Sequence, residues 1–293
     1  MKKLLRRMLV ILLALVFVGS SAVVLRQLYE QRLAEQAYQA AAEIALTASD
    51  PVSWESAVAV QEPLVPLPQE QQPEPEEIPE PQLPLTEEPE EAVQEPLPEE
   101  AELLLEVDLN VLREINADVL GWIHIPDTVI SYPLMRSKDN QEYLELTWDL
   151  KRSAAGSIFL ERKSSTDLSD FHTLIYGHNM KNDSMFGQLH EYRDQAFTES
   201  HPCVYIVKDD VVLRYEVFAA YTADVKSDTY RLYFEGEDRK QSAIDFYLEQ
   251  SEIKSELVPT AEDRLLTLST CTGLGDYNYR WVVQTVLTGR FPR

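Results

Sequence analysis

The sequence predicts a mainly β domain that closes into an eight-stranded barrel, preceded by an N-terminal helix and an extended linker. Eight short runs rich in β-branched and aromatic residues lie between turn-forming residues in the second half of the chain. Such short, regularly spaced strands are typical of a closed barrel. The runs are 121–127, 129–135, 156–161, 172–178, 203–209, 212–223, 265–271 and 280–289.

The N-terminus has the pattern of a membrane anchor. Four basic residues within positions 1–7 precede an uncharged stretch from Met8 to Leu25, which is about the minimum length that spans a bilayer. A cleaved signal peptide is the alternative, because Ser20–Ala22 offers small residues, but the apolar run is longer than a usual signal core. The excess of positive charge before the run predicts a single-pass protein of the cell membrane, with residues 1–7 in the cytoplasm and residues 104–293 outside.

Two segments separate this anchor, residues 8–25, from the barrel. Residues 26–48 lack glycine and proline and are rich in Ala, Leu, Glu and Gln, which predicts a helical stalk. Residues 49–103 are predicted to be a disordered linker, because Pro51–Glu100 holds 12 of the 17 prolines and 14 glutamates but no lysine or arginine. We expect this linker to be either inert or a tether that lifts the domain away from the membrane.

The charge and composition exclude several kinds of partner. The formal net charge is −24, more than half of it from the linker, and no large basic patch is apparent, which argues against nucleic acid. No short His or Cys spacing resembles a zinc site, so we predict neither a metal nor a cofactor. The remaining residues, 104–293, suit a single domain with a substantial core.

Two helices are expected within this domain. Apolar residues recur at helical spacing over 107–120 and again over 238–257, where Pro259 follows. The second helix would come directly before the strand that ends at Cys271.

The segment Leu266–Leu287 predicts a β-hairpin that brings a cysteine and an arginine together. Cys271 ends the first strand, a glycine-containing turn follows, and Arg280 opens the return strand. Paired strands lie about 5 Å apart, so Arg280 can lie beside Cys271 and donate hydrogen bonds to a developing oxyanion. Ser269 shares a strand face with Cys271. On the hairpin alone, a small buried cysteine and a solvated arginine explain the pattern equally well.

A cysteine nucleophile needs a base or a neighbouring cation near neutral pH. Among the five histidines, His178 follows an apolar strand and a glycine in YGHNM, and strand ends are where catalytic groups usually lie. The other four lie in strand runs (His124, His172) or in polar segments typical of the surface (His190, His201). His178 is therefore the candidate partner of Cys271.

The combination of YGHNM, TLSTC some ninety residues later and an arginine opening the next strand resembles the sortase family, specifically its class B. Further matching sequence segments are NADVLGWIHIPDTVISYPLM, GSIFL and MFGQL, so the resemblance covers most of Leu104–Arg293. One departure is Asp127, where many relatives have glycine. The resemblance implies a sortase-like barrel of eight strands, with N-terminal helices and one helix before the cysteine strand.

The resemblance also implies a cysteine transpeptidase. Cys271 would be the nucleophile, His178 the acid and base, and Arg280 the residue that positions substrate and stabilises the oxyanion. Ser269 and Thr270 would contact the substrate. The thiol would attack the threonine carbonyl of a sorting signal on a secreted protein, and an amine of a peptidoglycan precursor or of a pilin would resolve the thioacyl enzyme.

Three other functions fit part of the pattern. An L,D-transpeptidase also uses cysteine, histidine and arginine, but its arginine follows the cysteine more closely. A papain-like or NlpC-type peptidase has its nucleophile before its histidine, the reverse of the order here. An anchored binding module without catalysis is the third. Cys203, in a strand that suggests burial, either pairs with Cys271 or leaves it free, and a disulfide would consume the proposed nucleophile.

Overall fold

The computed structural model describes residues 2–47, 97–272 and 277–293. Most of the predicted linker, and four residues of the hairpin turn after Cys271, lie outside the described residues. The boundaries proposed for the anchor, the linker and the catalytic domain therefore stay predictions.

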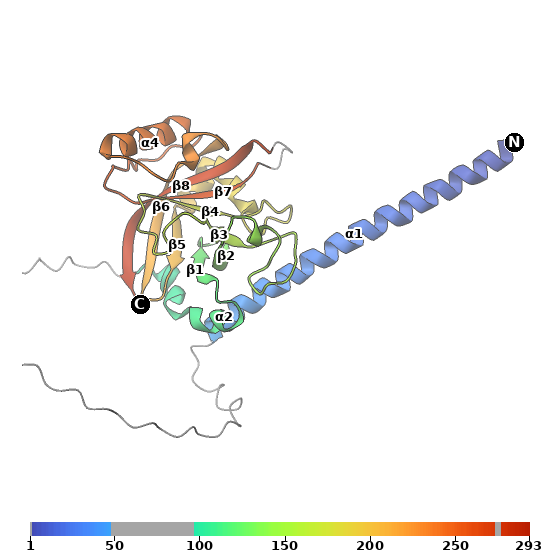
Figure 1. The fold of residues 1–293 in the computed structure, drawn as a ribbon, viewed down its shortest axis with the longest axis horizontal. Helices are drawn as coiled ribbons and strands as arrows, with labels where there is room; N and C mark the ends of the chain where they lie inside the picture. The colour runs from blue at the N-terminus through green and yellow to red at the C-terminus, as the bar shows by residue number, and fades with distance from the viewer. Residues whose placement is uncertain (1, 48–96, 273–276) are drawn as a thin grey trace, which may run out of the picture. The chain divides into compact units, whose positions relative to one another are not determined.

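Eight strands form a closed barrel in the order β1-β2-β3-β4-β7-β8-β6-β5 (Figure 1). The neighbours β2 and β3, and likewise β4 and β7, run parallel, whereas the other pairs are antiparallel. The strands are β1 (Val119–His124), β2 (Ser131–Arg136), β3 (Ile158–Leu160), β4 (His172–Tyr176), β5 (Cys203–Val207), β6 (Val211–Asp224), β7 (Leu265–Cys271) and β8 (Tyr279–Pro292). Each falls within or overlaps a predicted run, so the predicted closed eight-stranded barrel is confirmed.

The predicted N-terminal helix of the domain is shorter than expected. Helix α2 covers only Leu109–Ile115 and follows the 3-10 helix η1, Glu99–Glu106. The predicted extension to residue 120 is wrong, because Val119 and Leu120 belong to β1. Asn116 ends the helix: its backbone is extended, and its side-chain oxygen accepts from the Asp118 amide at 3.0 Å.

The helix before the cysteine strand is confirmed, but it too ends early. Helix α4 spans Glu237–Gln250 and not the predicted range to 257. The amide of Glu252 donates to the Ala220 carbonyl at 2.8 Å, which draws the chain onto β6 directly after the helix. The remaining short elements are α3 (Gln195–Ser200) and the 3-10 helices η2 (Glu142–Leu144), η3 (Gly187–Arg193) and η4 (Asp228–Tyr230).

Helix α1 runs without interruption from Lys2 to Thr47, so it contains both the predicted anchor and the predicted stalk. Its last third packs on the barrel domain through side chains that recur on one helical face. These buried residues are Ala34, Ala37, Tyr38, Ala41 and Ala45. The indole nitrogen of Trp148 donates to the Ala37 carbonyl at 2.8 Å, which fixes the helix on the domain. Among the described residues, no helix has the length and hydropathy of a membrane span.

The docking of α1 changes the expected role of the linker. The amide of Asp108 donates to the carbonyl of Ala45 at 2.9 Å, so the chain before the linker and the chain after it meet on the same domain. The expectation of a tether that lifts the barrel away from the anchor does not fit this contact, because α1 itself connects residues 2–33 to the barrel.

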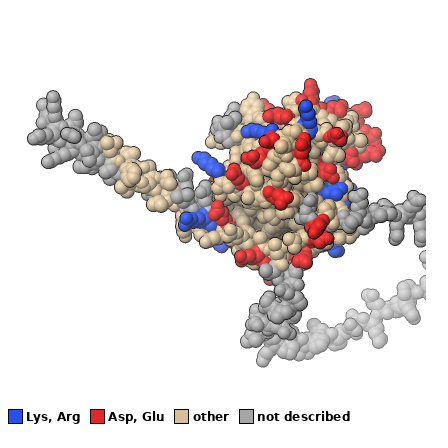
Figure 2. Space-filling view, turned by 180° about the vertical axis from the view of Figure 1, so that it is seen from behind, with Lys and Arg blue, Asp and Glu red and all other residues tan. Residues whose placement is uncertain are grey.

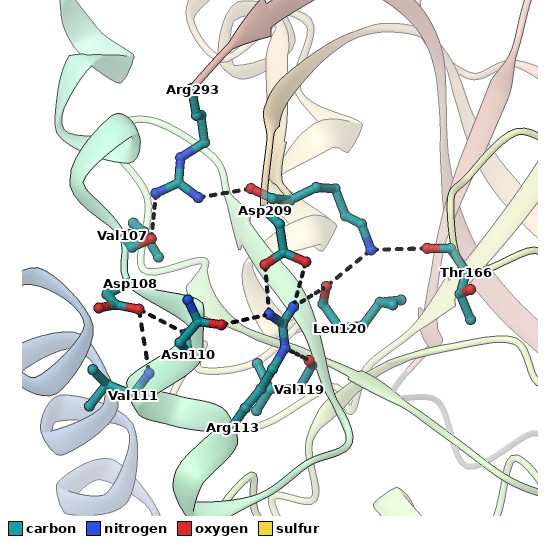
Figure 3. Close-up of polar contacts among 11 residues, drawn as sticks. Val107, Asp108, Asn110, Val111, Arg113, Val119, Leu120, Thr166, Asp209 and Arg293 are labelled. Atoms are coloured by element: carbon teal, nitrogen blue, oxygen red, sulfur yellow. Dashed lines mark hydrogen bonds and ion pairs between the residues drawn. The ribbon is translucent and has the colours of Figure 1, made fainter. Parts of the chain in front are cut away.

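Two arginines join the N-terminal helices to the end of the barrel (Figure 3). Arg113 of α2 donates to both carboxylate oxygens of Asp209, at 2.6 and 3.2 Å, and to the Val119 carbonyl at 2.9 Å. Arg293 donates to the Lys208 carbonyl at 2.8 Å and also to the Val107 carbonyl. Planar guanidinium groups suit such multiple contacts.

The face of the molecule drawn in Figure 2 carries many Asp and Glu side chains, with fewer Lys and Arg between them. The acidity of the chain, with a formal net charge of −24, is thus also visible on the folded domain and not confined to the linker.

A buried histidine lies inside the barrel wall. His172 is fully buried, and its Nδ1 lies 2.8 Å from the Arg231 carbonyl while its Nε2 lies 2.6 Å from the Thr267 hydroxyl. Because a carbonyl can only accept, Nδ1 carries the proton. Burial lowers the pKa of His172 to about 4, although the bond to Arg231 opposes this shift. The ring is therefore neutral at pH 7.

This burial predicts that the domain loses stability in mild acid. The folded pKa lies below the unfolded value of 6.5, so the unfolded chain binds the extra proton first and stability declines as the pH falls from 6.5 toward 4. The contribution amounts to about 3 kcal/mol over this range. Urea unfolding of the wild type and of His172→Gln at pH 7.5 and 5 measures it, because the variant should show a smaller decrease. Equal decreases would show that His172 does not titrate in this way.

Candidate active site

Cys271 and Arg280 face each other across the β7–β8 hairpin. Cys271 is the last residue of β7, and the strand register pairs it directly with Arg280 in β8. Side chains of directly opposed residues in an antiparallel pair lie on the same face, with Cβ atoms about 5 Å apart. Nη1 of Arg280 donates to the carbonyls of Tyr277 and Tyr279, both at 2.9 Å. The hairpin thus places the two residues together, as its sequence pattern predicts.

His178 reaches the same place from β4, which is the parallel neighbour of β7. The register pairs Tyr176 with Ser269, so two further residues along each chain lead to His178 and Cys271. The amide of Gly177 continues the ladder by donating to the Ser269 carbonyl at 3.2 Å. This parallel pairing explains how residues some ninety positions apart come to line one site.

A backbone carbonyl orients the His178 ring. Nε2 of His178 lies 2.8 Å from the carbonyl oxygen of Leu144, the last residue of η2. Since that oxygen accepts only, Nε2 carries a proton, and Nδ1 is the nitrogen left to exchange one. The ring can therefore take or give a proton at Nδ1 without losing its contact with Leu144.

Two side chains hold the backbone of the cysteine. The carbonyl oxygen of Cys271 accepts from Asn179 Nδ2 at 3.0 Å and from His190 Nε2 at 2.9 Å. The prediction that His190 lies on the surface is wrong: it is half-buried and stacked on Trp281, with ring centroids 6.0 Å apart. Burial lowers the pKa of His190, which favours the neutral ring as the donor.

Ser269 and Thr270 contribute hydroxyl groups from β7. The Ser269 hydroxyl lies 2.9 Å from the hydroxyl of Tyr230, and burial raises the pKa of Tyr230 to about 12, so that phenol stays protonated. Both Ser269 and Thr270 are only 2 % exposed. Within the described part of the chain, the buried Thr270 hydroxyl has no hydrogen-bond partner.

These residues surround one cleft of about 460 Å³. Its walls include all five residues singled out from the sequence: His178, Ser269, Thr270, Cys271 and Arg280. Its other lining residues are Asn140, Gln141, Leu144, Phe159, Glu161, Lys163, Tyr176, Gly177, Val225, Tyr230 and Leu232. A cleft of this size, open beside a thiol and a guanidinium, can receive an extended peptide segment.

The wall of the cleft also holds a buried carboxylate that sequence patterns did not indicate. Glu161 is 7 % exposed, and its Oε2 accepts from Asn140 Nδ2 at 2.5 Å and from the Tyr176 hydroxyl at 3.0 Å. Tyr176 directly precedes the Gly177–His178 pair and could have been noticed for that reason. Asn140, Glu161 and Tyr230 come from distant segments and carry no sequence signal of their own.

The described residues show no metal-binding cluster and no disulfide at this site. Over residues 2–47, 97–272 and 277–293, no group of three His, Cys, Asp or Glu side chains is arranged to hold a metal ion. No disulfide joins Cys203 to Cys271, so the Cys271 thiol is not consumed by a structural role.

Comparison with known proteins agrees with this geometry. Residues 123–288 match the family model described as a sortase domain. The chain is 37 % identical to Sortase B of Listeria monocytogenes over 182 residues, which cover 60 % of this chain and 72 % of that protein.

Two solved structures are similar to this one. The first is the "Staphylococcus aureus sortase B-substrate complex", with a TM-score of 0.58 at 30 % identity, covering 61 % of this chain and 84 % of that chain. The second is a crystal structure of sortase B complexed with triglycine, also with a TM-score of 0.58 at 30 % identity, covering 61 % of this chain and 85 % of that one. The L,D-transpeptidase, papain-like and non-catalytic alternatives are not supported by these relatives. The chain belongs to the sortase family, as a cysteine transpeptidase of the sortase B type.

Proposed function

We propose that this chain is a membrane-anchored class B sortase that cleaves a C-terminal sorting signal after threonine and joins the new carboxyl group to an amine of a peptidoglycan precursor. The observation that carries this proposal is the register pair of Cys271 and Arg280, with His178 on the same cleft. The descriptions of the relatives support a peptide substrate and an amine acceptor, since one was solved with a substrate and another with triglycine.

The first half-reaction forms a thioester. The proton of the Cys271 thiol passes to His178, and the Cys271 sulfur attacks the threonine carbonyl carbon, whose oxygen gains negative charge in the tetrahedral intermediate. The Arg280 guanidinium, opposite Cys271, donates hydrogen bonds to that oxygen. His178 gives a proton to the leaving amine as the carbon–nitrogen bond breaks, so the C-terminal fragment departs as a neutral amine.

The second half-reaction reverses the proton transfer. The acceptor amine attacks the thioester carbon, and His178 now takes the proton from the attacking nitrogen. The sulfur leaves as a thiolate while the new amide bond forms, and the proton on His178 returns to it. Nε2 of His178 is held by the Leu144 carbonyl, so Nδ1 is the nitrogen that can alternate between taking and giving a proton. Ser269 and Thr270, on the same wall of the cleft, are proposed to contact the sorting peptide.

The anchor completes the proposal. Basic residues before Met8–Leu25 support an orientation with the N-terminus on the cytoplasmic side of the cell membrane. The catalytic domain would then lie outside the cell, near secreted substrates. Because α1 continues from Lys2 to Thr47, the same helix would carry both the anchor and the part that packs on the barrel.

The experiment that tests this function uses the full chain in detergent micelles. It is incubated with a library of NPxTx-like and SPxTx-like peptides and with triglycine or a lysine-containing peptide, and intact-mass spectrometry follows the products. A thioacyl adduct on Cys271 and an amide product cut after threonine are expected. Preference for the lysine peptide would favour pilin polymerisation over wall anchoring.

One outcome would contradict the proposed reaction. If the folded protein carries a reactive Cys271 thiol but forms no adduct with any peptide, cleavage after threonine is not its reaction.

A further inference from the structure

We propose that helix α1 is part of the catalytic apparatus, because Tyr38 acts as a positioning residue for His178 through Gly156. This inference rests on the proposed role of His178. The helix was expected to be only a stalk, yet its Tyr38 hydroxyl is buried in the domain and donates to the carbonyl of Gly156.

The first step is the contact between the helix and the loop that follows η2. Besides Gly156, the Tyr38 hydroxyl lies 3.2 Å from the hydroxyl of Ser157. The Trp148 indole donates to the Ala37 carbonyl at 2.8 Å, so α1 contacts this loop at two separate points. Burial raises the pKa of Tyr38, which keeps the phenol protonated and able to donate.

The second step is the contact between the loop and the histidine. Gly156 has a φ of +56°, and a Cβ atom at this position would lie 2.9 Å from Cδ2 of His178 and 2.7 Å from the carbonyl oxygen of Leu144. That same oxygen accepts from Nε2 of His178. Gly156 therefore lies beside both the ring and the group that orients it, with no space for a side chain between them.

The loop is also stiff between these points. The Ser157 amide donates to the Tyr143 carbonyl at 2.8 Å, and the Ser153 amide donates to the Glu145 carbonyl at 2.9 Å. A shift of Gly156 must therefore move the backbone beside Leu144 as well. The hydrogen bond from Tyr38 fixes the position of the Gly156 backbone relative to α1. Through Gly156 it also fixes the position of the His178 ring.

Packing and hydrogen bonding together hold Tyr38. Its ring packs edge-on against Tyr132, with ring centroids 5.1 Å apart, and an open pocket of about 330 Å³ borders the contact. The hydroxyl adds the directional part of this contact, which Tyr38→Phe removes without removing the ring packing.

The test is Tyr38→Phe in the full chain, which removes only the hydroxyl. We expect kcat for transpeptidation to fall roughly 10-fold, while KM for the peptide changes less than about twofold, because displacing a reacting group affects the transition state more than substrate binding. Tyr192→Phe is the matched control, since its buried hydroxyl also donates to one backbone carbonyl, that of His201, at 2.8 Å. Melting temperatures of both variants separate catalysis from stability.

A double-mutant cycle shows whether Tyr38 acts through His178. In the His178→Ala background, single-turnover thioacylation should be no slower when Tyr38→Phe is added. The inference would be overturned if Tyr38→Phe lowered the thioacylation rate further in the His178→Ala background. Equal kcat values for Tyr38→Phe and Tyr192→Phe would also overturn it. An inactive wild type would instead count against the proposed function, so the two failures are distinguishable.

Discussion

Replacing Cys271 by alanine is expected to abolish the thioacyl enzyme and to lower transpeptidation by roughly 10⁴-fold or more, as in other enzymes that lose their nucleophile. The physical reason is that, among the described residues lining the cleft with His178 and Arg280, Cys271 alone supplies a sulfur atom. Intact-mass spectrometry of the full chain with a sorting peptide measures the adduct, and product formation with an amine measures turnover.

The control is Cys203→Ser. Cys203 opens β5 and forms no disulfide with Cys271, so its replacement should leave turnover within about twofold of the wild type. Equal activity of the wild type and Cys271→Ala would disprove the thioacyl mechanism. Loss of the adduct in Cys203→Ser but not in Cys271→Ala would place the nucleophile at the other thiol.

Arg280→Ala is expected to lower kcat/KM by about 10² to 10³-fold, the usual cost of removing a donor to a developing oxyanion. Arg280→Lys should recover only part of this loss, because an ammonium group lacks the planar fork of a guanidinium. Steady-state kinetics with one peptide and one amine give both values.

Arg290→Ala is the matched control for this prediction. Arg290 lies further along the same strand, β8, where it is exposed and pairs with Leu213 of β6 and not with a residue of the cleft. Its removal should change kcat/KM less than about twofold. Similar losses for Arg280→Ala and Arg290→Ala would mean that general positive charge, and not the position beside Cys271, is what matters.

The barrel and the pairing of Cys271 with Arg280 were predictable because both depend on short-range patterns. Alternating apolar residues and turn signals define strands locally, and a hairpin brings Cys271 beside Arg280 through nearest-neighbour pairing alone. Helix ends were less predictable. Besides its local bond to the Asp118 amide, Asn116 donates to the Trp148 carbonyl, and the Glu252 amide donates to the Ala220 carbonyl. Both of these carbonyls are distant in the chain, and periodicity does not report such contacts.

The docking of α1 was not predicted, although a signal existed. Alanines and a tyrosine recur from Ala34 to Ala45 at the spacing of one helical face, which is a pattern for close packing. Composition alone favoured a solvated stalk, and the adjacent proline-rich segment favoured a tether. The hydrogen bond from the Asp108 amide to the Ala45 carbonyl shows instead that the end of α1 lies on the barrel domain.

By itself, the sequence determined the fold class and the family, and it singled out the residues proposed to carry the chemistry, because strand periodicity and the two short motifs around His178 and Cys271 are local properties. Only the tertiary structure decided that His190 and Asn179 hold the cysteine backbone, that Glu161 and Tyr230 line the cleft, and that α1 supports the loop behind His178. Those contacts join residues that are remote in the chain. They exist because closing the barrel and packing α1 against it bring such residues to one place, which no local pattern specifies.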